Sequence, residues 1–146
     1  MKVATFNINN INKRRQNLLA WLAASKPDVV CLQELKSAQA DFPVESLRNI
    51  GYEAVWCGQR SWSGVAILAR GQVPVLTRSS LPGDAADLQA RYIEAAVNGI
   101  LFTSIYLPNG VRICPLMQSS SCAMIWMQCF NKFDPSDTSA LLSSSA

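Results

Sequence analysis

The segment DVVCLQE at residues 28–34 is a short, nearly continuous apolar run that ends in a carboxylate. A run of this length predicts a strand buried on both faces, with Glu34 at its exit. The segment KVATFNI at residues 2–8 predicts a second strand, because its alternating apolar residues favour extended backbone and an Asn-rich turn follows it. If the two strands are neighbours, the side chains of Asn7 and Glu34 collect at the same sheet edge.

Two helices and several further strands are expected up to residue 110. Asn12 is placed to cap a helix that continues to Ala24, and Pro43 suits the first turn of a second helix. The pair Asn98-Gly99 predicts a type I′ turn between two antiparallel strands. The further strands are expected at residues 52–57, 64–69, 75–77, 92–97 and 100–106. This pattern predicts an α/β fold in which strands outnumber helices.

Length and composition place the chain among single-domain globular proteins, since its 146 residues mix apolar and charged side chains and carry a net charge of +3. No apolar run approaches the roughly 20 residues that span a bilayer, and the N-terminus becomes polar too early for a signal peptide. We therefore expect a cytoplasmic protein without a membrane partner. The five cysteines cannot all pair, which favours reduced thiols.

Asn7 and Glu34 supply the oxygen ligands that a hard cation such as Mg²⁺ prefers. Alone they make half of a metal site, and a single glutamate after a strand is more often a solvated loop residue or a helix cap. The chain contains no histidine, so it lacks the commonest general base and a very common metal ligand. The residues by themselves therefore leave both readings open.

Several blocks of the sequence occur in the order and spacing of a known family. They are FNINNI (6–11), PDVVCLQELK (27–36), GVAIL (64–68), RYIEA (91–95) and YLPNG (106–110). Over residues 1–110 the chain resembles the exonuclease III / AP endonuclease family of the endonuclease/exonuclease/phosphatase superfamily. The resemblance implies an α/β sandwich of two sheets, with four layers in the complete family, of which this chain would hold the N-terminal part.

The resemblance also implies roles for three residues. Glu34 matches the metal-binding glutamate, and Asn7 matches the asparagine beside it. Tyr106 matches the tyrosine whose phenol reaches the scissile phosphate, so it is the candidate catalytic residue. The implied cofactor is Mg²⁺ or Mn²⁺, and the implied partner is double-stranded DNA. The implied activity is that of a phosphodiesterase that acts as a 3′-5′ exonuclease and abasic-site endonuclease in DNA repair.

The chain departs from this family in its second half. The family's Gly-Asp-x-Asn segment and its late Asp-His pair are missing, since Asp134 and Asp137 are the only acidic residues after Gly110. We therefore expect a truncated site with impaired catalysis, so that whether the chain is an enzyme stays open. The alternatives are a non-catalytic remnant that binds nucleic acid or metal weakly, and a phosphodiesterase of the superfamily that acts on RNA or small phosphoesters.

Residues 111–146 differ in composition from the rest of the chain, since they hold eight serines, three of the five cysteines and three of the four methionines. We interpret them as an unrelated, poorly ordered tail that arose by frameshift, with a genuine divergent tail as the competing explanation. The second sheet is then expected to be missing, which would leave an apolar face exposed and favour aggregation. No specific protein partner is predicted.

The residues that bind substrate are left undetermined by the sequence. Lys13, Arg14, Arg15 and Arg60 could contact DNA phosphates, but a solvated helix face or loop explains each of them equally well. Trp62 is expected to anchor its loop to the sandwich rather than to stack on nucleic acid.

Overall fold

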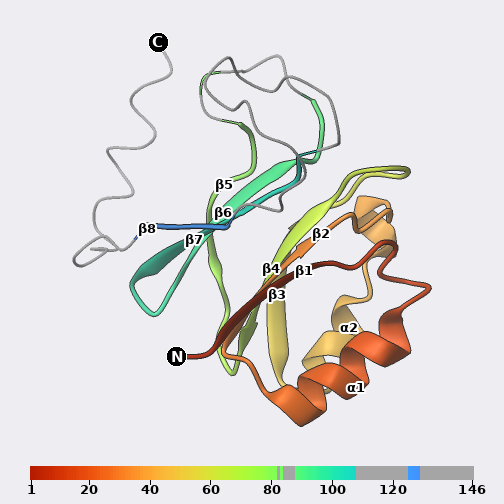
Figure 1. Cartoon of the computed structure of the whole chain (residues 1–146), viewed down its shortest axis with the longest axis vertical. Coiled ribbons are helices and arrows are strands. Elements are labelled where there is room, and N and C mark those ends of the chain that lie inside the picture. Colours follow the sequence, from red (N-terminus) through yellow and green to blue (C-terminus); the bar gives the residue numbers. More distant parts are fainter. Residues whose placement is uncertain (82, 84–87, 108–124, 129–146) are drawn as a thin grey trace.

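The structure is a computed structural model that describes residues 1–81, 83, 88–107 and 125–128 of the chain. Its strands and helices form two sheets with helices on one side (Figure 1). In chain order the elements are β1 (Val3–Asn7), α1 (Arg15–Ser25), β2 (Val29–Gln33), the 3₁₀ turn η1 (Gln39–Asp41), α2 (Val44–Arg48), β3 (Tyr52–Cys57), β4 (Val65–Arg70), β5 (Val75–Arg78), β6 (Tyr92–Val97), β7 (Ile100–Ile105) and β8 (Ile125–Gln128).

The first sheet has the strand order β1-β2-β4-β3. β1 and β2 are parallel, whereas β4 runs antiparallel to both β2 and β3. All five residues of β2 are buried, as its continuous apolar run predicts. Helices α1 and α2 cover one face of this sheet and contribute Leu18, Leu22 and Leu47 to its core.

A second sheet, with the order β5-β6-β7-β8, covers the other face of the first. The residues of the shared core are Val29, Cys31, Val65, Ile67 and Ala69 from the first sheet and Ile93, Ala95, Val97 and Phe102 from the second. The expected α/β sandwich is therefore confirmed. The expectation of a missing second sheet and an exposed apolar face is wrong, because alternate residues of the β6–β7 hairpin supply the apolar surface that covers that face.

The β6–β7 hairpin turns at Asn98-Gly99 as predicted. Both turn residues have left-handed backbone, with φ of 52° at Asn98 and 73° at Gly99, as a type I′ turn requires. The register pairs Val97 with Ile100 directly across the turn. Because the side-chain period of a strand is two, this register places Ile93, Ala95 and Val97 on the same face of β6.

The first helix begins later than the sequence predicts, at Arg15 instead of directly after Asn12. The Asn12 amide does not cap it, because Nδ2 donates to Ser37 Oγ and to the Asp41 carbonyl, each at 3.1 Å. Asn10 serves the preceding turn, since its Oδ1 accepts a hydrogen bond from the Lys13 backbone N–H at 3.0 Å. None of the helices in the described ranges is long and apolar enough to cross a membrane.

Tyr92 is a buried tyrosine of β6 whose hydroxyl donates a hydrogen bond to Glu94 Oε2 at 2.9 Å. Burial raises the pKa of Tyr92 to about 12, and the hydrogen bond to the Glu94 carboxylate and its charge act in the same direction. The pKa of Tyr92 in the folded state lies above its ordinary value of 10.0. The contribution of its protonated hydroxyl to the free energy of unfolding is therefore complete below pH 10.0 and is lost as the pH rises through about 12.

We expect the free energy of unfolding to fall over this alkaline range, and to fall less in Tyr92→Phe. Denaturant unfolding at a series of pH values, with tyrosinate absorbance followed in parallel, measures both quantities. Titration of Tyr92 at the ordinary tyrosine pKa in the intact fold would contradict this expectation.

Candidate functional site

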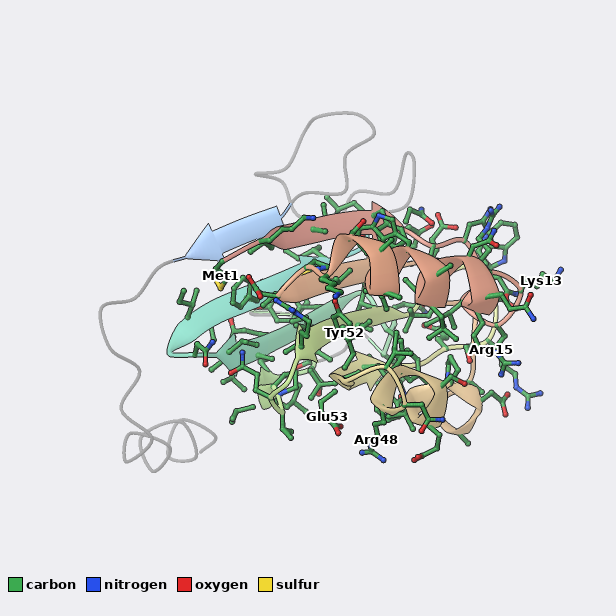
Figure 2. The ribbon with its side chains drawn as sticks, turned by 90° about the horizontal axis from the view of Figure 1, so that it is seen from below. Met1, Lys13, Arg15, Arg48, Tyr52 and Glu53 are labelled. Atoms are coloured by element: carbon green, nitrogen blue, oxygen red, sulfur yellow. The ribbon has the colours of Figure 1, made fainter. Side chains whose placement is uncertain are left out.

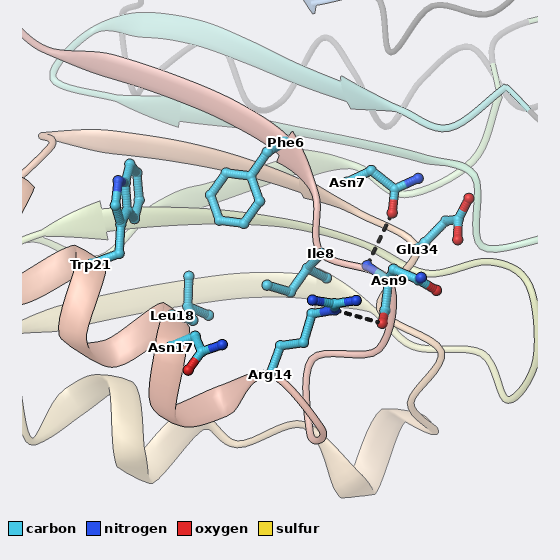
Figure 3. A pocket seen from close by; sticks show the side chains of 9 residues that line it. All are labelled: Phe6, Asn7, Ile8, Asn9, Arg14, Asn17, Leu18, Trp21 and Glu34. Atoms are coloured by element: carbon cyan, nitrogen blue, oxygen red, sulfur yellow. Dashed lines mark hydrogen bonds between the residues drawn. The ribbon is translucent and has the colours of Figure 1, made fainter.

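The C-terminal ends of β1 and β2 meet at one edge of the first sheet, because the two strands are parallel. Asn7 lies opposite Gln33, the residue before Glu34. The turn after β1 is hydrogen-bonded to the exit of β2, with Ile8 N donating to Gln33 O and Asn10 N to Glu34 O, both at 2.9 Å. The side chains of Asn7 and Glu34 consequently lie side by side (Figure 3).

Tyr106 reaches the same place from the second sheet. It directly follows β7, and its backbone N–H donates to the Arg91 carbonyl at 2.8 Å. Its hydroxyl interacts with the Glu34 carboxylate. The structure therefore brings together all three residues singled out from the sequence, although they lie far apart along the chain.

The protonation states of Glu34 and Tyr106 are set by their mutual contact and by their neighbours. Partial burial acts to raise the pKa of Glu34, but hydrogen bonds from Lys36, Asn7 and Tyr106 together outweigh it and hold the pKa below its ordinary value. Burial, followed by the hydrogen bond and charge of Glu34, raises the pKa of Tyr106, while Arg91 opposes the shift. At neutral pH the site therefore holds an ionised carboxylate and a protonated phenol that can donate a hydrogen bond.

Lys36 is a member of the site that the sequence analysis missed. Its Nζ lies 2.9 Å from Glu34 Oε2 and donates to Asn9 Oδ1 at 2.7 Å. A lysine two residues after a strand normally extends into solvent, and no motif in the local sequence signals this contact. The Lys36 ammonium places a positive charge beside the Glu34 carboxylate. A bound cation would share this carboxylate with the ammonium or displace it.

The backbone of the site is held in conformations that side chains rarely adopt. Asn9, Asn10, Glu34 and Lys36 all have positive φ, between 46° and 85°. Asparagine tolerates this region, so the Asn9-Asn10 pair could have been predicted to turn here, whereas glutamate and lysine rarely adopt it. Strained residues of this kind cluster at functional sites, because the surrounding structure must fix them in place.

A cavity of about 690 Å³ lies between β1 and α1 beside Asn7 and Glu34. Its apolar lining residues are Phe6, Ile8, Leu18 and Trp21, and its polar ones are Asn7, Asn9, Arg14, Asn17 and Glu34 (Figure 3). The Arg14 guanidinium is held in place by its Nε, which donates to the Asn9 carbonyl at 3.4 Å. The cavity lining thus combines apolar side chains with polar ones that carry both charge signs.

The four basic residues left undetermined by the sequence differ in position. Arg14 lines the cavity, and Lys13 and Arg15 lie at the same end of the molecule, opposite Met1 (Figure 2). Arg60 is exposed, with Nη2 at 3.9 Å from Asp41 Oδ2. Positive charge is therefore concentrated at the N-terminal end of α1, which lies beside the cavity.

Arg91 is a second residue that the sequence analysis did not assign to the site. Its Nε is buried and makes no hydrogen bond to any described residue. Its charge acts on Tyr106, whose backbone it also contacts. An unpaired buried N–H of a charged group is costly, so this position favours an anion as the missing acceptor.

A buried polar network fixes the two sheets to each other beneath the site. The Gln33 amide Nε2 donates to Thr5 Oγ1 at 3.0 Å and to Ser104 Oγ at 3.2 Å. Ser104 Oγ in turn donates to the Leu32 carbonyl at 3.2 Å. Since Gln33 precedes Glu34 and Ser104 lies two residues before Tyr106, this network sets the distance between the carboxylate and the phenol.

The residues present fit part of a site for a hard divalent cation. Glu34 offers a carboxylate and Asn7 an amide oxygen, and Mg²⁺ is commonly held by one or two carboxylates together with water and substrate phosphate. Among the described residues no three histidine, cysteine, aspartate or glutamate side chains gather in one place. A closed zinc site, which needs four nitrogen or sulfur ligands, is therefore not formed by this part of the chain.

Comparison with known proteins gives consistent matches. The model of the Endonuclease/Exonuclease/phosphatase family matches residues 4–137. Exodeoxyribonuclease III of Haemophilus influenzae is 41% identical over 114 residues, which cover 75% of this chain and 42% of that protein. The 3′ phosphatase NExo of Neisseria, solved with a product DNA hairpin, is 39% identical with a TM-score of 0.72 and covers 75% of this chain and 42% of that one.

An AP endonuclease from Archaeoglobus fulgidus has a similar structure, with 35% identity and a TM-score of 0.70. The match covers 77% of this chain and 43% of that protein. The chain thus spans less than half the length of each of these relatives.

Proposed function

Because the chain belongs to the endonuclease/exonuclease/phosphatase family, we propose that Glu34, Asn7 and Tyr106 form part of a DNA phosphodiesterase site of the exodeoxyribonuclease III type that uses Mg²⁺ or Mn²⁺. The observation that carries this proposal is the convergence of an ionised carboxylate and a protonated phenol at one sheet edge. Glu34 and Tyr106 are 72 positions apart in the chain, so their contact requires both sheets to be in place. A glutamate that is merely solvated would not require such a contact.

Each side chain has a role in this proposal. Glu34 and Asn7 hold the cation, which when bound supplies positive charge to neutralise the phosphate. Tyr106 donates its phenolic proton in a hydrogen bond to a phosphate oxygen, and its raised pKa keeps that proton in place at neutral pH. Arg91, whose positive charge acts on Tyr106, adds to the attraction for a phosphate anion at the site.

DNA is the favoured substrate because the relatives are named for it. The match in Haemophilus influenzae is an exodeoxyribonuclease, and the Neisseria phosphatase was solved with a DNA hairpin. The positive charge at Lys13, Arg14 and Arg15 supports a polyanionic partner at the same end of the molecule. RNA and small phosphoesters serve as comparison substrates in the test below.

We expect catalysis by this chain to be impaired. It contains no histidine, and among the described residues no three histidine, cysteine, aspartate or glutamate side chains gather to complete a metal and acid–base centre. Loss of acid–base groups alone typically lowers a rate by about 10² to 10⁴. Slow cleavage under single-turnover conditions is therefore the expected activity.

The test is cleavage of an end-labelled DNA duplex that carries a recessed 3′ end and an abasic-site analogue. We expect slow cleavage with Mg²⁺ and none with EDTA, and a single-turnover rate about 10²-fold lower in Tyr106→Phe, since one donor to the phosphate is lost. Tyr92→Phe removes a phenol that donates its hydrogen bond to Glu94 and not to Glu34, and it should leave the rate unchanged. Cleavage that survives EDTA, or that prefers RNA or a small phosphoester, would refute the proposal.

A non-catalytic binder is the second candidate, favoured by the complete absence of histidine. It predicts DNA binding that responds to Mg²⁺ through Glu34 without any cleavage. The same labelled duplex separates the two functions, because binding is read from its mobility on a native gel and cleavage from its length on a denaturing gel.

A further inference from the structure

Trp62 is the one aromatic side chain with a large exposed surface in the described part of the chain. Its exposed fraction is 75%, whereas Trp21 packs edge-on against Phe6 and Trp56 stacks on Phe42. The expectation that Trp62 anchors its loop to the sandwich is therefore wrong. Holding so large an apolar ring in water is unfavourable, so its position needs another explanation.

The loop that carries Trp62 is fixed rather than loosely attached. Ser61 and Trp62 both have left-handed backbone, with φ of 67° and 60°. Ser63 N donates to Ser61 O at 2.7 Å, and Ser63 O accepts from Lys36 N at 2.9 Å. The loop is thus hydrogen-bonded to the segment that follows Glu34, and the strained backbone presents the ring outward at a defined place.

Lys36 connects the ring to the candidate phosphate site. Its Nζ lies 5.5 Å from the centroid of the Trp62 ring and 2.9 Å from Glu34 Oε2. One ammonium group therefore contacts both the exposed aromatic face and the carboxylate. An aromatic surface beside a cationic group is the combination that binds a nucleotide, with the base on the ring and the phosphate near the charge.

We propose that Trp62 is a stacking surface for an unpaired base of the DNA strand whose phosphate binds at Glu34 and Tyr106. This inference rests on the proposed function and deepens it, because it adds a contact for an unpaired base at the end of a duplex substrate. A base inside a duplex already stacks on its neighbours, so its faces are not available to the ring. Trp62 is a binding residue in this proposal and takes no part in bond cleavage.

The test measures binding and not cleavage, so it stands apart from the test of the proposed function. Fluorescence anisotropy in EDTA compares a labelled hairpin with a short unpaired 3′ overhang and the same hairpin with a blunt end. We expect Trp62→Ala to weaken binding of the overhang hairpin about tenfold, the size of one base–aromatic stacking interaction. Binding of the blunt hairpin should change less than twofold, and Trp62→Phe should restore most of the affinity for the overhang.

Val73→Ala is the matched control, because Val73 is 69% exposed and follows β4 at the end of the sheet opposite Glu34. It should bind both hairpins as the unchanged chain does. Intrinsic fluorescence gives a second readout, since stacking on a base quenches tryptophan emission, and the overhang hairpin should quench the unchanged chain more than Trp62→Phe.

Equal loss of affinity for both hairpins, or none for either, would overturn the proposal, and so would failure of the unchanged chain to bind DNA. Trp62-dependent binding without any cleavage would support this inference while the proposed enzymatic activity fails. The reverse result, Mg²⁺-dependent cleavage with no effect of Trp62→Ala on binding, would refute this inference alone.

Discussion

Glu34→Gln is expected to weaken the binding of Mn²⁺ or Mg²⁺ by more than about 100-fold. Loss of a group that only orients a metal ligand typically costs 10- to 100-fold in metal affinity, and Glu34 is the proposed ligand itself. The substitution keeps the size and the hydrogen-bonding oxygen of the side chain but removes the negative charge that a hard cation requires. Electron paramagnetic resonance of free Mn²⁺ during a titration measures the affinity directly.

The control for this substitution is Glu53→Gln, which removes the same charge at a different place. Glu53 Oε2 accepts a hydrogen bond from Arg48 Nε at 3.0 Å on β3, away from the site. This variant should bind Mn²⁺ as the unchanged chain does. A similar loss of affinity in both variants would mean that the cation responds to overall charge and that Glu34 is not a ligand. Thermal unfolding of both variants confirms that each is folded.

Gly64→Ala is expected to cost about 2–5 kcal/mol of folding free energy. Gly64 has φ of +105°, where an L side chain is strained, and an added Cβ would lie 2.7 Å from Leu35 Cβ. Leu35 is fully buried and directly follows Glu34, so it cannot move away without disturbing the site. Gly64 O also accepts a hydrogen bond from Leu35 N at 3.1 Å. Denaturant unfolding gives the free energy.

Gly71→Ala separates the two causes of this loss. Gly71 has φ of +71°, but an added Cβ would meet no atom within 4 Å. It should therefore show only the backbone cost of about 1–2 kcal/mol. Equal losses in Gly64→Ala and Gly71→Ala would show that the contact with Leu35 is not tight, and the account of how this loop is held against the site would fail.

The local fold could be predicted from the sequence wherever one physical signal dominated. The continuous apolar run of β2 predicts a buried strand, and the Asn98-Gly99 turn predicts the β6–β7 hairpin, because each depends on residues adjacent in the chain. The start of α1 could not be predicted in the same way. Asn12 is a good capping residue, but contacts with Ser37 and Asp41 use its amide elsewhere.

The second sheet was missed because the family resemblance ended near residue 110 and the sheet was expected beyond that point. Strands β5 to β7 lie before it, and only the three-dimensional packing shows that they leave the first sheet and cover it. Strand pairing over long sequence distances depends on the whole core, which local patterns do not encode.

The candidate site was predictable at Asn7, Glu34 and Tyr106, because sequence blocks marked each of them. Lys36 and Trp62 could not be predicted, since their contact depends on left-handed backbone in two loops. Arg91 was visible only as part of a sequence block, and the burial of its Nε without an acceptor among residues 1–81, 83, 88–107 and 125–128 is seen only in the folded chain. The roles of all these residues stay predictions until they are measured.

The most direct measurement of the central claim is the affinity for a DNA duplex with and without Mg²⁺, at constant ionic strength, in the unchanged chain and in Glu34→Gln. If the cation and the phosphate share one site at Glu34, each must strengthen the binding of the other. Mg²⁺ should then tighten DNA binding by the unchanged chain and have no such effect on Glu34→Gln. An equal response to Mg²⁺ in both proteins, or no tightening in either, would contradict the claim.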